Sequence, residues 1–124
     1  MNIVDTSGWL AFFNGEKNAD VFAEPISDHQ MLLVPTICVY EIFKFVKSKA
    51  GEAEAVRIVA HLKQGRIVEL NEKTALEAAD IAIRHKLAMA DSIIYATASM
   101  ENAVIWTQDA DFRELPGVKY FAKQ

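Results

Sequence analysis

Four carboxylates are the side chains best suited to do chemistry in this chain. Each lies beside apolar segments rather than in a run of charges, and they are Asp5, Glu41, Asp91 and Asp109. If they meet in the fold, each pair ~4 Å apart repels by about 4 kcal/mol at an effective dielectric of about 20. A hard divalent cation such as Mg²⁺ relieves this repulsion, because it prefers oxygen ligands. Such a centre can activate a water and stabilise the oxygens of an in-line phosphoryl displacement.

Each acid taken singly also has a simpler interpretation. Asp5 can accept hydrogen bonds from a nearby helix start, and Asp91 can be a helix N-cap. Glu41 can be half-exposed and paired with Lys44, and Asp109 can open a turn. The elements that position these acids therefore decide between structural and chemical roles.

Short apolar runs alternate with helical patterns along the chain. We expect strands at 2–5, Leu32–Val34, Arg66–Leu70, Ala103–Thr107 and, as an edge strand, Val118–Phe121. We expect helices at Ser7–Phe13, from an N-cap at Thr36 to Gly51, at Glu52–Gln64, from a cap at Asn71 to Arg84, and at 91–101, with residues 16–30 a loop or short helix. This alternation predicts one α/β domain over residues 1–124, with a mostly parallel sheet of four to five strands flanked by helices.

The carboxyl ends of the strands are expected to bring acids together. Ligands of open parallel sheets bind beyond these ends, near the point where strand order reverses. Asp5 ends the first strand, Asp109 lies two residues past the fourth, and Glu41 lies early in the helix after the second. Glu41 and Asp91 have mostly apolar neighbours one turn away, so both should need compensation for lost hydration. The helix of Glu41 is apolar nearly all round, which predicts that it is largely buried.

The remaining acids are expected to be solvated. Three of them belong to two polar helical stripes, which are Lys73–Glu77–Asp80–Arg84, opposite Leu76, Ala79 and Ile83, and Glu54–Arg57–His61–Gln64. Zinc is a poor fit, because no His/Cys set has ligand spacing. The only cysteine is Cys38, which excludes an internal disulfide.

The charge balance leaves a nucleic-acid substrate open. The net charge is −4, from 17 acids and 13 bases. If four acids bind a metal, the remaining 13 acids equal the 13 bases in number. We therefore expect basic residues only around the rim of the site, and not over a whole face of the protein. Lys44, one turn from Glu41, is the candidate RNA contact. No apolar run is long enough to span a bilayer and no export signal is visible, which favours the cytoplasm and no membrane partner.

The four acids and their surroundings resemble the acidic quartet of PIN-domain ribonucleases, especially the VapC-type toxins of toxin–antitoxin pairs. The matching segments, in family order over essentially the whole chain, are "IVDTSGW", "VPTICVYEIF", "LAMADSIIYATA" and "VIWTQDADF". The resemblance implies a three-layer PIN-like sandwich, RNA cleavage that depends on Mg²⁺ or Mn²⁺, a cognate antitoxin and a homodimer. By position, Asp5, Glu41 and Asp91 become the core metal-binding and catalytic acids, and Thr6 and Thr107 become supporting polar residues.

The last motif offers two candidates for the fourth acid of the quartet. We prefer Asp109, which follows Thr107 at the family spacing, and we expect Asp111 to cap the turn that follows. Many relatives carry an Arg in this motif where this chain has Gln108 and Ala110, so contacts with substrate should differ there.

Other classes of protein fit the sequence less well. A receiver-like phosphoacceptor domain also places acids at strand ends, but it pairs adjacent acids near its start and has a Lys after a late strand, and this chain has neither feature. An acid-anhydride phosphatase would need a second acid two residues after Asp5, where Ser7 stands. A PIN domain without catalysis, acting as a scaffold, is disfavoured by the intact quartet.

Overall fold

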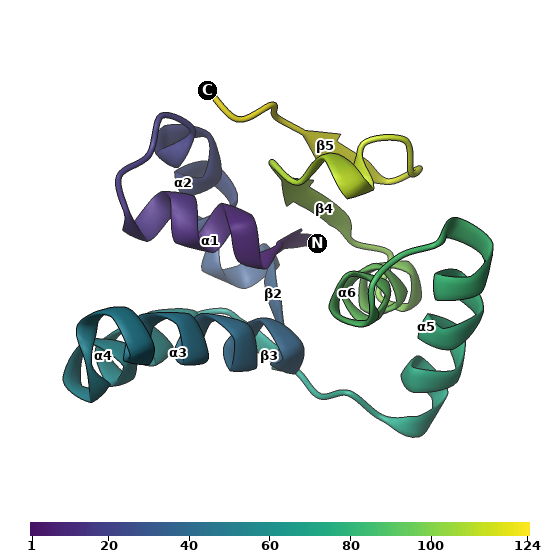
Figure 1. Cartoon of the computed structure of the whole chain (residues 1–124), viewed down its shortest axis with the longest axis horizontal. Coiled ribbons are helices and arrows are strands. Elements are labelled where there is room, and N and C mark those ends of the chain that lie inside the picture. The colour runs from purple at the N-terminus through teal and green to yellow at the C-terminus, as the bar shows by residue number, and fades with distance from the viewer.

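The computed structural model describes all residues from 1 to 124 (Figure 1). The strands are β1 (Asn2–Val4), β2 (Leu32–Pro35), β3 (Arg66–Val68), β4 (Val104–Thr107) and β5 (Val118–Tyr120). The helices are α1 (Thr6–Phe13), α2 (Ala19–Ser27), α3 (Thr36–Ala50), α4 (Glu52–Leu62), α5 (Glu72–His85) and α6 (Met89–Met100), with short 3₁₀ turns η1 (His29–Met31) and η2 (Ala110–Phe112). The expected α/β class and order of elements are confirmed.

All five strands are parallel, in the order β3-β2-β1-β4-β5. The chain runs outward from β1 to β3, then returns to the other side of β1 and ends at β5. Because crossovers between parallel strands are right-handed, these two directions place helices on opposite faces. Figure 1 shows α1 to α4 on one side of the strands and α5 and α6 on the other. The strand order reverses between β1 and β4, so the carboxyl ends of these two strands flank the expected ligand site.

The core holds the strand ends in place. Ile3 and Val4 of β1 and every residue of β2 are buried. Helix α1 packs closely on this core at Gly8, where an added Cβ would lie 2.7 Å from Val4 Cγ1 and 2.9 Å from the ring of Phe22. A larger residue would therefore push α1 away from β1. The close approach fixes the first turn of α1, which follows Asp5 directly.

Of the two residues expected to cap α3 and α5, one is confirmed and one is wrong. Asn71 caps α5 as expected, since its side chain accepts the N–H of Thr74 at 2.9 Å. Thr36 does not cap α3, because Pro35 is the N-cap and Thr36 is the first helical residue. The hydroxyl of Thr36 instead accepts the N–H of Leu70 at 3.3 Å, which ties α3 to the segment after β3.

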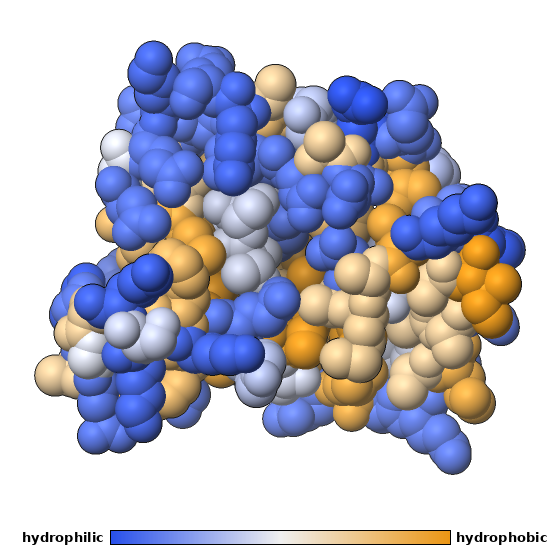
Figure 2. Space-filling view, in the orientation of Figure 1, coloured by the Kyte–Doolittle hydropathy of each residue, from blue (hydrophilic) through white to orange (hydrophobic).

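One expectation about burial is wrong. Helix α3 buries one face, while Tyr40 is 60% exposed and Phe45 is also exposed, because α3 is covered by its neighbours on one side only. On α5 the apolar residues Leu76 and Ile83 are exposed as well as the polar stripe, because α5 is an outer helix that packs mainly on α6. Figure 2 shows apolar surface on this side of the molecule. No helix is long and apolar enough to cross a membrane.

Candidate metal centre and active site

Asp5 joins the end of β1 to the start of α1. It is 3% exposed, and it is the N-cap of α1, accepting the N–H of Gly8 at 3.0 Å. The hydroxyl of Ser7 lies 2.9 and 3.0 Å from its two oxygens, and the hydroxyl of Thr107 donates at 2.9 Å. The capping role considered from the sequence is therefore real. Burial nevertheless raises the pKa of Asp5 to about 6, since its hydrogen bonds only partly replace lost water and Asp109 adds negative charge.

Two threonines, Thr6 and Thr107, each donate a hydrogen bond to one of the acids. Thr107, fully buried at the end of β4, donates to Asp5 and accepts the backbone N–H of Asp109 at 2.9 Å. One hydroxyl thus links the carboxyl ends of the two strands at the switch point. Thr6 donates to Oε1 of Glu41 at 2.6 Å, which connects α1 to α3. Both hydroxyls therefore fix the separation of acids that come from different elements.

Asp91 is the most perturbed acid of the set. The interpretation of Asp91 as a helix cap is wrong, because Ala88 is the N-cap of α6 and Asp91 lies in the first turn. No hydrogen bond within the chain compensates its half-buried carboxylate, so burial raises the pKa of Asp91 to about 7. The negative charges of Asp109, Asp5, Asp111 and Glu41 raise it further. The other acids named from the sequence therefore all raise the pKa of Asp91.

The buried thiol of Cys38 lies beneath the same region. Burial raises the pKa of Cys38 far above its ordinary value, and the charges of Asp5, Glu41 and Asp91 raise it further. These three acids come from the end of β1, from α3 and from α6. Because all three acids raise the pKa of Cys38, the thiol lies close to the place where these elements meet.

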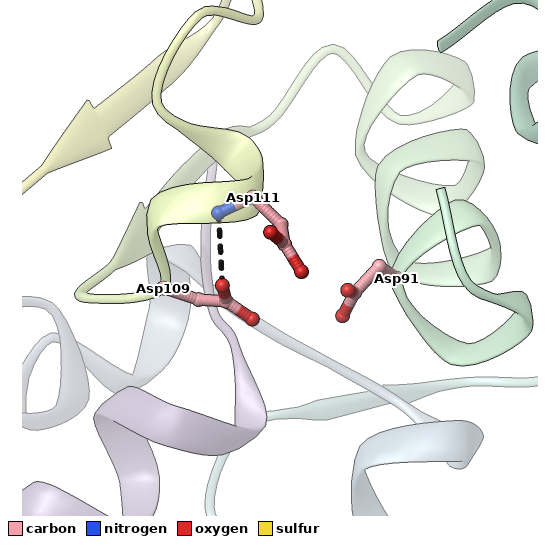
Figure 3. Close-up of side chains that lie close together, drawn as sticks. All are labelled: Asp91, Asp109 and Asp111. Atoms are coloured by element: carbon pink, nitrogen blue, oxygen red, sulfur yellow. Dashed lines mark hydrogen bonds between the residues drawn. The ribbon is translucent and has the colours of Figure 1, made fainter. Parts of the chain in front are cut away.

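The tightest group of acids is Asp91, Asp109 and Asp111, shown in Figure 3. One carboxylate oxygen of each lies within 4.8 Å of the others. The expectation that Asp111 caps the turn is wrong: Asp109 caps η2 and accepts the N–H of Asp111 at 2.9 Å. The exposed carboxylate of Asp111 points toward Asp91, as Figure 3 shows. Asp5 and Glu41 lie outside this group of three.

The basic residues around the site are mostly engaged elsewhere. Arg84 pairs with Glu77 at 3.7 Å, and Arg113 pairs with its neighbour Glu114 at 3.6 Å. Lys44 makes no ion pair with Glu41, so the alternative of a surface pair is wrong. The Lys44 ammonium lies instead 5.7 Å from the centre of the Tyr40 ring and remains exposed.

The donor set fits a hard divalent cation. Every candidate ligand is a carboxylate oxygen, and Mg²⁺ or Mn²⁺ favours such oxygens over nitrogen and sulfur. Three carboxylates within 4.8 Å of one another, one of them with a pKa near 7, are a group whose repulsion a cation would relieve. No comparable group of His or Cys ligands exists in the chain.

The family described as PIN domain matches residues 3–118. The chain belongs to the PIN domain family. No curated protein is similar enough in sequence to be counted as a relative. Solved structures with the same fold include a toxin–antitoxin complex from Klebsiella pneumoniae, with a TM-score of 0.85 and 22% identity over 98% of this chain and 99% of that one.

Two further structures of PIN folds are similar over nearly their whole length. VapC20 of Mycobacterium tuberculosis, described as a Sarcin-Ricin loop cleaving toxin, has a TM-score of 0.77 at 16% identity, covering 95% of this chain and 97% of that one. FitAcB from Neisseria gonorrhoeae has a TM-score of 0.75 at 24% identity, covering 98% and 97%. The resemblance to PIN domains noted from the sequence is confirmed, and so is the PIN fold.

One residue beside the acids was missed from the sequence, and another was ranked second. Ser7 was treated only as part of a helix start, although its hydroxyl reaches both oxygens of Asp5. The signal was its position two residues after an N-cap Asp, from which a hydroxyl can return to the cap. Asp111 was the less favoured of the two candidates for the fourth acid, and its oxygen lies within 4.8 Å of an oxygen of Asp91 and of Asp109.

Proposed function

We propose that this PIN domain is an endoribonuclease that depends on Mg²⁺ or Mn²⁺ and acts as the toxin of a type II toxin–antitoxin pair. The observation that carries this proposal is the convergence of acids on Asp91 from the end of β1, from α3 and from the segment after β4. A structural role would not require so much uncompensated negative charge in one place, because each unpaired carboxylate opposes the folded state. The membership of the family and the nuclease among the structural neighbours support the same activity.

The chain's own residues would divide the work as follows. Asp91 and Asp109, with Asp111, would bind the cation, while Asp5 and Glu41 would hold its waters and order the surrounding hydroxyls. The bound cation would supply an activated water and neutralise charge on the phosphodiester oxygens. Glu41 accepts the Thr6 hydroxyl through Oε1 only, so Oε2 is free to accept a hydrogen bond or proton from that water. No serine, cysteine or histidine nucleophile is needed.

The toxin role rests on the surface as well as on the neighbours. An apolar groove of ≈ 120 Å³ between α1, α3 and α4 is lined by Leu10, Phe13, Phe45 and Ile58, and an antitoxin segment would cover it. A second copy of the chain would cover the exposed apolar residues of α5 and the start of α6, where Ile83 is 78% and Met89 is 73% exposed. We place the toxin in the cytoplasm, where its RNA substrate and antitoxin are made.

The test is RNA cleavage by the purified chain with Mg²⁺, with Mn²⁺ and with a chelator. We expect cleavage only with a cation, and loss of cleavage in Asp5→Asn with an unchanged circular dichroism spectrum. Asp20→Asn, which makes the same change at an exposed acid of α2, is the matched control and should cleave like the unmodified chain. Full cleavage by Asp5→Asn would refute the site. For the toxin role, expression alone should arrest growth, and co-expression of the protein encoded directly upstream should restore it.

The receiver-like alternative is disfavoured by the topology. Receiver-type doubly wound sheets have the strand order 2-1-3-4-5, whereas this sheet has the order β3-β2-β1-β4-β5. A non-catalytic PIN scaffold would have no need to keep Asp91 beside the other acids. Phosphate transfer to Asp5 from a small phosphodonor would favour signalling, and absence of cation-dependent cleavage would favour the scaffold.

A further inference from the structure

Two pockets flank the acidic centre, one on each side of the start of α1. The α3 pocket has a volume of ≈ 350 Å³ and includes Thr6, Tyr40, Glu41, Lys44 and Ser48. The β5 pocket has a volume of ≈ 390 Å³ and includes Ser7, Gln108, Asp109, Tyr120 and Lys123. Both volumes fall within the range of about 300–1,000 Å³ that is usual for pockets that hold small ligands.

The two pockets meet at the proposed reaction centre. Thr6 lines one and Ser7 lines the other, so two consecutive residues of α1 separate them. Each pocket also has one acid of the site in its wall, Glu41 in the α3 pocket and Asp109 in the β5 pocket. A chain molecule bound in both pockets would therefore pass over the acidic centre.

Each pocket pairs an aromatic ring with a cation. In the α3 pocket, Tyr40 is 60% exposed and the Lys44 ammonium lies 5.7 Å from its ring centre. In the β5 pocket, Tyr120 lines the wall with Lys123, and neither lysine has an ion-pair partner. Aromatic rings stack nucleic-acid bases with little preference for sequence, and lysines neutralise the phosphates between them. The same pair of groups on both sides suits two nucleotides joined by a phosphodiester.

We propose that the α3 and β5 pockets bind the nucleotides on the two sides of the cleaved bond in single-stranded RNA. Tyr40 and Tyr120 stack the two bases, and Lys44 and Lys123 contact the neighbouring phosphates. The occupant is single-stranded because a base must leave its helix to stack on a tyrosine. This inference rests on the proposed function, since it assigns the substrate-binding residues of that same site.

The first test measures binding of fluorescein-labelled single-stranded RNA of random sequence by anisotropy, with Ca²⁺ in place of Mg²⁺. Tyr40→Leu and Tyr120→Leu remove the rings, and Tyr40→Phe and Tyr120→Phe keep them. Because stacking on a side chain is worth about 1–3 kcal/mol per base, we expect each Leu variant to bind about 5-fold more weakly or worse, and each Phe variant to bind within about 2-fold of the unmodified chain. Leu variants that bind normally, or Phe variants as weak as the Leu variants, would overturn the stacking role.

The lysines are tested by the salt dependence of the same binding. Loss of one phosphate contact to a single strand lowers the slope of log affinity against log salt by about 0.7. We expect this change in Lys44→Gln and in Lys123→Gln. The matched control is Lys63→Gln, an exposed lysine just before β3 and therefore at the opposite end of the strands, which should leave the slope unchanged. Equal slopes in all three variants would overturn the phosphate contacts.

Cleavage assays separate this inference from the proposed function. If the pockets bind RNA uniformly, their variants raise KM and leave kcat nearly unchanged, whereas Asp5→Asn loses kcat. Cleavage with normal KM in every pocket variant would refute the RNA-binding role of the pockets and leave the proposed nuclease activity standing. RNA binding that depends on the pockets, without cleavage in Mg²⁺ or Mn²⁺, would refute the nuclease activity and leave the RNA-binding role of the pockets standing. Variants that lose antitoxin binding but bind RNA normally would assign the pockets to the protein partner and overturn the proposal.

Discussion

Removing the charge of Asp91 should stabilise the metal-free protein. Asp91 accepts no hydrogen bond within the chain, so Asp91→Asn removes a repelled charge without breaking a contact. Burial, with the negative charges of Asp109, Asp5, Asp111 and Glu41, raises its pKa from 3.8 to about 7. At about 1.4 kcal/mol per pKa unit, the upper bound on the gain is about 4 kcal/mol. Because half of the group remains near water, screening reduces this to about 1–2 kcal/mol.

The sign and the pH range follow from the direction of the shift. A carboxyl whose pKa is higher in the folded state binds its proton more tightly there, so folding is favoured while the group is protonated. The unmodified chain therefore loses stability as pH rises from about 4 through about 7, because Asp91 ionises over this range. The Asp91→Asn variant has no carboxyl group at this position and does not lose this stability. The difference between the two should be small near pH 4 and complete above about pH 7.

The assay is thermal unfolding followed by circular dichroism in a chelator, across this pH range. A gain of 1–2 kcal/mol in a chain of this length raises Tm by roughly 4–8 °C. Asp80→Asn makes the same change on the exposed stripe of α5 and should shift the free energy of unfolding by less than about 0.5 kcal/mol. Added Mg²⁺ should stabilise the unmodified chain more than Asp91→Asn, because binding to the folded state raises its stability. An Asp91→Asn variant that melts below the unmodified chain at about pH 8 would refute the reasoning.

Three further substitutions test a buried hydrogen bond, a candidate cation ligand and the packing of α1. Thr107→Val keeps the shape but leaves the Asp109 N–H unpaired, so urea unfolding should show a loss of about 1–3 kcal/mol, and Thr107→Ser should recover most of it. Asp111→Asn should weaken Mn²⁺ binding in calorimetry as much as Asp109→Asn does, whereas a cation held by Asp109 alone predicts no change. Gly8→Ala should cost about 1–3 kcal/mol in urea unfolding, because its Cβ overlaps buried side chains, and normal stability would contradict that packing.

The sequence predicts the sheet well because strand ends carry local signals. Apolar runs mark the buried strands, and the acids that follow β1 and β4 could be placed at the same edge of the sheet because each follows the end of a strand. The strand order, which puts β1 and β4 side by side at the switch point, came only from the structure. The cap at Asn71 was also predictable from nearby residues, because its side chain accepts the N–H of Thr74, three positions along the chain. Thr36 was misassigned because Pro35 before it already has the extended backbone of an N-cap, and a long-range contact with Leu70 uses the hydroxyl.

Burial of helix faces was harder to predict, because it depends on what lies opposite. The apolar character of α3 suggested a buried helix, yet Tyr40 and Phe45 face solvent. On α5, Ile83 is exposed although its spacing fits a core position. A sequence pattern separates polar from apolar faces, but it does not say whether the apolar face meets the core, a pocket or a partner.

The hydrogen bonds around Asp5 imply unequal roles for the acids. Both of its oxygens accept bonds, from the Gly8 N–H and from the hydroxyls of Ser7 and Thr107, so its position is fixed without a cation. Asp91 has no such partner and is free to adjust. A fixed acid is suited to orient metal-bound water, and a free one to complete the coordination of an arriving cation. Ser7→Ala would then loosen Asp5 and lower the cleavage rate more than cation affinity, whereas equal losses in both would show that Asp5 is itself a direct ligand.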